Sequence, residues 1–131
     1  MFERKRIIGV MEKVKILIAE DNRISYEYLR EILKNEGTDI LLAKNGTEAV
    51  KICEENTDLD LVFMDIKMPE MDGGEATRKI KSMRPELPII AQTAYALNDE
   101  REAILKKGFD AYLAKPIQRK EIQAILDKFL H

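Results

Sequence analysis

The sequence of 131 residues has few of the side chains on which many catalytic and metal sites depend. It holds one cysteine, Cys53, so no internal disulfide can form, which favours a reducing, cytosolic setting. Cys53 shares a predicted apolar helical face with Ala49 and Val50, which indicates a packing role. The one histidine is His131, at the C-terminus. We therefore do not expect a histidine-based metal site, a Ser-His-Asp triad or a phospho-accepting histidine.

The sequence also lacks an excess of either charge and any long apolar run. Lys and Arg total 22 against 24 Asp and Glu, and the formal net charge of −2 offers no electrostatic footprint for nucleic acid or an anionic membrane. Apolar runs such as Leu61–Met64 are far shorter than the ~20 residues of a membrane-spanning helix. The basic stretch Arg4–Arg6 begins like a secretory signal, but the apolar part after it is too short. We expect neither nucleic-acid binding nor membrane insertion.

The length and composition predict one packed domain. The apolar fraction of 45% and the charged fraction of 35% are typical of a globular protein. A chain of this length buries about two-thirds of its surface on folding. Residues 1–12 are interpreted as a linker, an upstream remnant or a tag, and residues 13–131 as the domain.

Short apolar runs alternate five times with stretches of helical periodicity. This alternation predicts an α/β fold, in which βαβ units build a parallel sheet covered on both faces. The predicted strands cover residues 14–19, 39–43, 59–64, 89–92 and 111–114. The predicted inward helical faces consist of Ile24, Tyr28, Leu29, Ile32 and Leu33, then Ala49, Val50 and Cys53, then Ala76, Ile80 and Met83, then Ile104 and Leu105, and finally Ile122, Ile125, Leu126 and Phe129.

Polar side chains directly follow four of the predicted strands. Glu20 and Asp21 follow the first, Asp65 the third, Thr93 the fourth and Lys115 the fifth. In open parallel α/β sheets, ligands bind at the carboxyl ends of the strands. Three carboxylates at one edge repel one another unless a cation joins them, and Mg²⁺ suits a few carboxylates with waters and phosphate oxygens. The sequence therefore predicts a magnesium site with a lysine beside it.

Such an edge suits phosphoryl transfer, which needs an in-line nucleophile and positive charge near the transferring group. The Asp65 carboxylate can serve as the nucleophile, and Lys115 and a Thr93 hydroxyl can contact the phosphoryl oxygens. Each residue alone also has a structural interpretation. Glu20 and Asp21 suit a solvated helix start, Asp65 a turn, Thr93 a helix cap and Lys115 a surface charge. Their joint placement at one sheet edge favours the functional interpretation.

Four segments resemble the receiver domain of two-component response regulators, over Lys13–Leu130. The resemblance implies a flavodoxin-like (βα)5 fold with the strand order 2-1-3-4-5. The segments that carry it are residues 16–22 (ILIAEDN), 64–73 (MDIKMPEMDG), 88–94 (PIIAQTA) and 112–117 (YLAKPI).

The resemblance also implies roles for the residues around the acidic cluster. Asp65 matches the phospho-acceptor, and Asp21, Asp65 and the backbone carbonyl of Lys67 match the Mg²⁺ ligands. Glu20 is one methylene longer than the Asp often found at its position, and we expect it to reach the metal through water. Lys67 and Tyr95 lie at positions that vary in the family, and we expect both to tune the dephosphorylation rate by screening the acyl phosphate from water.

By the same resemblance, Thr93 and Tyr112 match the switch residues and Lys115 the phosphate-binding lysine. Pro116 matches a position with a cis peptide bond, which costs only ~1 kcal/mol before proline. The implied mechanism is a two-state equilibrium in which Thr93 and Tyr112 move on phosphorylation. This movement is expected to reshape the face formed by the fourth helix, the fifth strand and the fifth helix, where a downstream protein would bind.

Residues 71–78 and 91–96 look most like receivers of hybrid sensor histidine kinases. The chain has no room for an output domain, so we expect either such a receiver or a stand-alone response regulator. The expected donor is a histidine kinase or a histidine phosphotransfer domain. The expected state is a cytoplasmic monomer or a weak, phosphorylation-dependent homodimer. We do not expect a separate enzyme, although the parent of a hybrid receiver would be a histidine kinase.

Three other interpretations remain at this point. A phosphatase of the haloacid dehalogenase type would have a second Asp two residues after the nucleophile, where this chain has Lys67. A receiver-like module that acts by contact alone would usually have lost one of the site residues. A nucleotide-binding flavodoxin-like protein would have a glycine-rich loop after the first strand, and this chain has none there.

Overall fold

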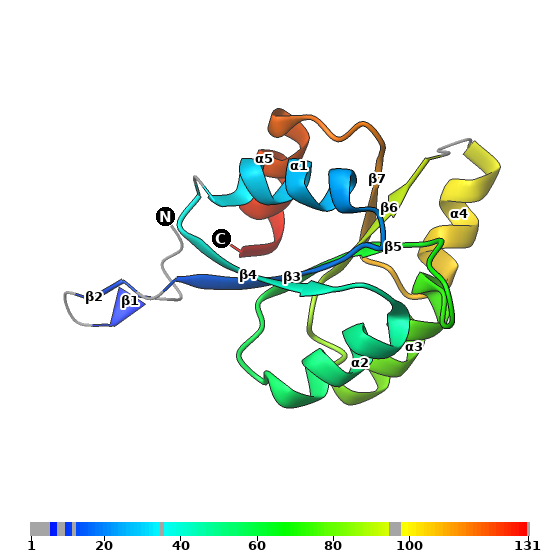
Figure 1. The fold of residues 1–131 in the computed structure, drawn as a ribbon, viewed down its shortest axis with the longest axis horizontal. Coiled ribbons are helices and arrows are strands. Elements are labelled where there is room, and N and C mark those ends of the chain that lie inside the picture. Colours follow the sequence, from blue (N-terminus) through cyan, green and yellow to red (C-terminus); the bar gives the residue numbers. More distant parts are fainter. Residues whose placement is uncertain (1–5, 8–9, 12, 35, 95–97, 131) are drawn as a thin grey trace.

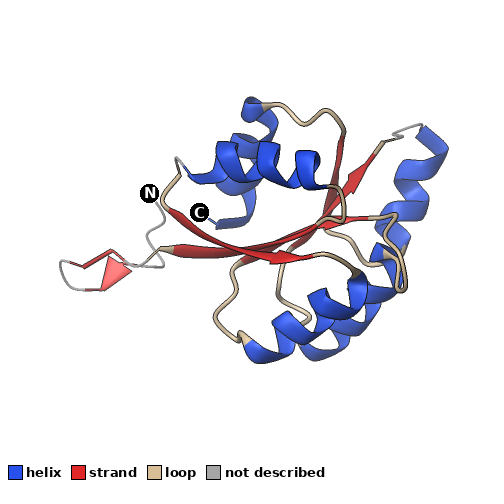
Figure 2. Cartoon of the chain, in the orientation of Figure 1, coloured by secondary structure: helices blue, strands red, loops and turns tan. Residues whose placement is uncertain are grey.

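A five-stranded parallel sheet lies between two layers of helices (Figures 1 and 2). The computed structural model describes residues 6–7, 10–11, 13–34, 36–94 and 98–130. The strands of the sheet are β3 (Val14–Ala19), β4 (Thr38–Ala43), β5 (Leu61–Asp65), β6 (Ile89–Thr93) and β7 (Ala111–Ala114). The helices are α1 (Arg23–Lys34), α2 (Gly46–Glu55), α3 (Gly73–Met83), α4 (Asn98–Lys106) and α5 (Arg119–Leu130).

The order of strands across the sheet is β4-β3-β5-β6-β7. Numbered along the chain as the five strands of the sheet, this is 2-1-3-4-5, and the predicted fold is confirmed. The register pairs Ala19 with Met64, Asp65 with Gln92, and Thr93 with Ala114. The carboxyl ends of the strands therefore meet at one edge of the sheet.

Two short strands, β1 (Arg6–Ile7) and β2 (Val10–Met11), pair with each other in an antiparallel hairpin outside the main sheet. The interpretation of residues 1–12 as a linker, an upstream remnant or a tag stays a prediction. Among the described residues, no helix is both long and apolar enough to cross a membrane.

The sheet separates two hydrophobic clusters. The side that carries α1 and α5 holds Phe63 and Leu126, and the side that carries α2 and α3 holds Met64 and Ile80 (Figure 1). All residues of β5 are buried, because the central strand is covered on both faces. Burial of one large apolar side chain contributes about 1.5–3 kcal/mol, so the two clusters are the main source of stability. Cys53 packs in the second cluster, and burial raises the pKa of its thiol to about 11, as expected for a packing residue.

Four side chains that periodicity assigned to the core are exposed instead: Ile24 by 81%, Tyr28 by 48%, Met83 by 41% and Leu105 by 45%. Ile24 and Tyr28 belong to the first turns of α1, at the sheet edge, where their neighbour is the loop after β7. Met83 and Leu105 lie in the last turns of α3 and α4. Helical periodicity identifies which face of a helix points inward. It does not show how far along the helix neighbouring elements bury that face.

Candidate functional site

Three carboxylates gather at the carboxyl edge of the sheet. Glu20 directly follows β3 and is 2% exposed, and Asp65 ends β5 and is 7% exposed. Asp21 is exposed. One oxygen of each side chain lies within 4.8 Å of the others. The burial of Glu20 shows that the alternative of a solvated helix-start cluster does not hold for that residue.

Lys115, the first residue after β7, is the cation of this cluster. Its Nζ donates hydrogen bonds to Glu20 Oε1 at 2.8 Å and to Asp65 Oδ2 at 3.3 Å. Burial alone would lower the pKa of Lys115, but the hydrogen bond to Glu20 and the nearby Asp65 charge raise it. The ammonium is therefore fixed in its charged form beside the two buried carboxylates.

The pKa of Glu20 is raised to about 7, first by burial and then by the neighbouring Asp65 carboxylate, and the Lys115 hydrogen bond offsets only part of this rise. The backbone N–H of Asn22 also donates to Glu20 Oε2, at 3.2 Å. Close carboxylates of this kind are stabilised by a cation. The cluster offers only oxygen ligands, which hard divalent ions such as Mg²⁺ prefer, so the residues fit such an ion.

The loop after Asp65 holds that side chain in place. The backbone N–H of Lys67 donates to Asp65 Oδ1 at 3.2 Å, and the N–H of Gly73 donates to the Ile66 carbonyl at 2.9 Å. A Cβ at position 73 would overlap the Asp65 carbonyl oxygen, so this close approach requires glycine. Asp72 caps the following helix α3 by accepting from the N–H of Glu75.

The remaining predicted site residues lie at the same edge or next to it. Thr93 ends β6 and is 9% exposed, and its carbonyl accepts a hydrogen bond from the Lys115 N–H at 2.8 Å. Tyr112 on β7 is partly buried, with the guanidinium of Arg101 5.0 Å from its ring centroid. The Lys115–Pro116 bond is cis, as the resemblance implied. Tyr95 lies outside the described residues, so its predicted role was not tested.

Two features of this region were missed from the sequence. Gln92 is 1% exposed beside Asp65, and its Nε2 has no hydrogen-bond partner among the described residues. Tyr28 donates a hydrogen bond of 2.5 Å from its hydroxyl to the Ile117 carbonyl. The two residues are 89 positions apart, and periodicity assigned Tyr28 to the core, so no sequence signal indicated this contact.

Comparison with known proteins gives one consistent result. A family model described as the response regulator receiver domain matches residues 16–127. Hybrid signal transduction histidine kinase I of Dictyostelium discoideum is 35% identical over 121 residues, which are 86% of this chain. The chain spans only 7% of that kinase and 13% of histidine kinase 3 of Arabidopsis thaliana.

Solved receiver structures are also similar. The receiver domain of sensor histidine kinase PA1611 from Pseudomonas aeruginosa PAO1, described with a magnesium ion coordinated in its active-site cleft, is 37% identical with a TM-score of 0.83. That match covers 90% of this chain and 98% of the other. The Saccharomyces cerevisiae receiver of Ssk1, solved with the histidine phosphotransfer protein Ypd1, is 30% identical with a TM-score of 0.83, covering 92% of this chain and 91% of the other.

Proposed function

This chain belongs to the response regulator receiver domain family of two-component signalling, and we propose that Asp65 is its phospho-acceptor, with Mg²⁺ bound beside it. One observation carries this proposal. The Asp65 carboxylate ends the central strand within 3.3 Å of the Lys115 ammonium, in a cluster that presents two further carboxylate oxygens within 4.8 Å. No other group of three potential metal ligands of this kind is found among the described residues.

The proposed reaction transfers a phosphoryl group from a phosphohistidine to Asp65. A carboxylate oxygen of Asp65 forms the new O–P bond while the P–N bond of the donor breaks, and the imidazole nitrogen keeps the electron pair. Lys115 contacts a phosphoryl oxygen and offsets its charge, and the Thr93 hydroxyl donates to another. When bound, Mg²⁺ supplies positive charge at the equatorial oxygens, held by Asp21, Asp65 and the Lys67 carbonyl, with Glu20 acting through water.

Phosphorylation is proposed to change the face formed by α4, β7 and α5. Thr93 moves toward the phosphoryl group, and Tyr112 turns inward into the space that Thr93 leaves. Arg101 stacks on the Tyr112 ring in the present structure, so inward rotation of Tyr112 would break this contact. A downstream protein that binds this face would then distinguish the two states. Lys67 and Tyr95 are proposed to tune the lifetime of the acyl phosphate.

The donor is proposed to be a histidine kinase or a histidine phosphotransfer domain. The complex of the similar Ssk1 receiver with Ypd1 supports a donor of this class. The similarity to hybrid kinases supports an origin as the receiver part of such a protein, with the stand-alone response regulator as the second possibility. A cytoplasmic location and a monomer or weak phosphorylation-dependent homodimer belong to the same proposal.

Intact-mass measurement after incubation with acetyl phosphate and Mg²⁺ tests the phospho-acceptor. We expect an adduct of one phosphoryl group on the native chain, no adduct on Asp65→Asn, and none with the metal chelated. Asp72→Asn is the matched control, because Asn caps a helix as well as Asp does, and it should keep the adduct. If the native chain, confirmed to bind Mg²⁺, took a phosphoryl group neither from acetyl phosphate nor from phosphohistidine donors, it would act by contact alone.

A further inference from the structure

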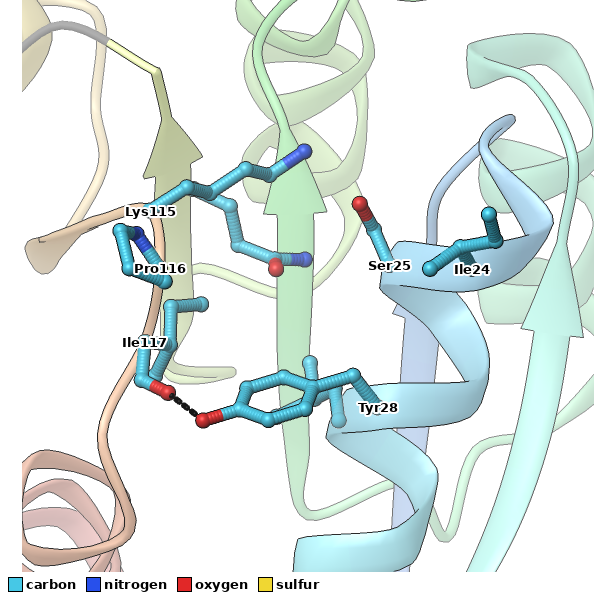
Figure 3. Close-up of a pocket in the computed structure, with 8 residues that line it drawn as sticks. Ile24, Ser25, Tyr28, Lys115, Pro116 and Ile117 are labelled. Atoms are coloured by element: carbon cyan, nitrogen blue, oxygen red, sulfur yellow. Dashed lines mark hydrogen bonds between the residues drawn. The ribbon is translucent and has the colours of Figure 1, made fainter.

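A cavity of about 440 Å³ lies between α1 and the loop that joins β7 to α5 (Figure 3). Tyr28 of α1 forms one wall, Pro116 and Ile117 form the opposite wall, and Gln92 and Lys115 also line it. Lys115 therefore borders open space along one side, next to the carboxylate cluster. On that side, Lys115 lacks the close packing of a core residue.

Besides its ion pairs with Glu20 and Asp65, the position of Lys115 depends on how its backbone is held. On one side, the N–H of Lys115 donates to the Thr93 carbonyl at 2.8 Å, in continuation of the pairing of β6 with β7. On the other side, two residues further along, the Ile117 carbonyl accepts the 2.5 Å hydrogen bond from the Tyr28 hydroxyl across the cavity (Figure 3). The loop is therefore anchored on both sides of Lys115, to the sheet and to α1.

The hydroxyl of Tyr28 is well suited to hold this loop. The ring has only two rotatable bonds, so little conformational freedom is lost when its hydroxyl is fixed. Tyr28 is 48% exposed, so the side chain is not required for filling the core, and its hydroxyl hydrogen bond joins α1 to the loop.

We propose that Tyr28 is a positioning residue for Lys115. Through the Ile117 carbonyl, its hydroxyl holds the loop of residues 115–117 at the distance from α1 that directs the Lys115 ammonium toward Asp65. This inference rests on the proposed function, since Lys115 is there the group that contacts the phosphoryl oxygens. Removing the hydroxyl alone would leave Lys115 in the chain but allow its ammonium to leave the site.

Tyr28→Phe tests the proposal, because it removes only the hydroxyl from a half-exposed ring. The probe is beryllium trifluoride with Mg²⁺, an analogue of the phosphoryl group, titrated by calorimetry. We expect Tyr28→Phe to weaken analogue binding roughly 3- to 10-fold, as for loss of one hydrogen bond, without weakening the binding of Mg²⁺ alone. The two affinities separate because the proposed metal ligands, which are the carboxylates and the Lys67 carbonyl, lie outside the loop of residues 115–117.

Ser82→Ala is the control, since it removes a hydroxyl that donates to the Lys79 carbonyl at the end of α3 away from Asp65, and it should leave analogue binding unchanged. Equal analogue affinity in Tyr28→Phe and the native chain would overturn the positioning role. Equal weakening of analogue and Mg²⁺ binding would also overturn it, by indicating a general distortion. If the native chain itself bound no analogue, the proposed function would fail, and this inference with it. If the native chain bound the analogue and Tyr28→Phe bound it equally well, only this inference would fail.

Discussion

The ammonium of Lys115 lies 2.8 Å from the carboxylate of Glu20, closer than its 3.3 Å to Asp65. The lysine that we propose to contact the phosphoryl group is thus paired most closely with the residue whose pKa is raised to about 7. Glu20 therefore has two proposed tasks, as a water-mediated metal ligand and as the partner that keeps Lys115 at the edge. Both depend on its charge.

Glu20→Gln should change how stability depends on pH in the metal-free protein. The pKa of Glu20 is about 7 in the folded state against 4.5 in the unfolded reference, so its stabilising contribution is complete below pH 4.5 and is lost as the pH rises through 7. Gln resembles the protonated acid at every pH. We expect the free energy of unfolding of Glu20→Gln, relative to that of the native chain, to rise by on the order of 1–3 kcal/mol from pH 5 to pH 8. Urea unfolding with a chelator at both pH values measures these free energies. A difference between the variant and the native chain that does not change with pH would contradict the raised pKa of Glu20.

Lys115→Ala should destabilise the metal-free protein by roughly 1–3 kcal/mol at neutral pH, because it leaves two buried carboxylates without their cation. The loss should be smaller in a Glu20→Gln background, since a neutral amide needs no cation. A double-mutant cycle from urea unfolding measures this coupling. Strict additivity would mean that the ion pair with Glu20 contributes nothing.

Gly73→Ala should lower the free energy of unfolding by about 1–3 kcal/mol, because the new methyl group would overlap the Asp65 carbonyl oxygen. Gly74→Ala is the control on the next residue of the same helix. A Cβ at position 74 would meet the Lys107 side chain at 3.1 Å, and that flexible chain can move aside. Gly74→Ala should therefore be neutral or stabilising, through the higher helix propensity of alanine. Equal effects of both changes in thermal unfolding would show that the approach to Asp65 is not tight.

Thr77→Val should stabilise the protein by about 1 kcal/mol. Thr77 is fully buried in α3, and its hydroxyl has no hydrogen-bond partner among the described residues. Valine keeps the shape and removes the unpaired polar atom, whose burial is unfavourable. The exposed Thr47→Val is the control and should change the free energy of unfolding by less than about 0.5 kcal/mol. A destabilised Thr77→Val would indicate that a bound water satisfies the hydroxyl.

Much of the fold was predictable because the pattern that specifies it is local. The strands over residues 14–19 and 111–114 match the prediction in full, since each is a short apolar run between clear turn signals. The third strand was predicted to begin at residue 59 but begins at Leu61. Apolar character alone does not show where backbone pairing starts, because Leu59 is buried in the core outside the strand.

The sequence was sufficient to predict which residues form the site, but not how deeply each of them is buried. The rule that ligands bind at strand ends brought Glu20, Asp65 and Lys115 together correctly. The same rule treated Glu20 and Asp21 alike, although one is buried and the other is exposed. The burial of these two residues depends on packing between elements that are distant in sequence. The contact of Tyr28 with Ile117 depends on the same kind of packing, and no local sequence pattern predicts either.

The two hydrophobic clusters share no residue, because the fully buried strand β5 and its neighbours form a wall between them. We therefore expect substitutions in the layer of α1 and α5 to have little effect on packing in the layer of α2 and α3, and the reverse. We expect that recognition surfaces on the two layers could then diverge separately in evolution. The strands of the sheet, together with the edge that carries the carboxylates and the lysine, must satisfy both layers at once.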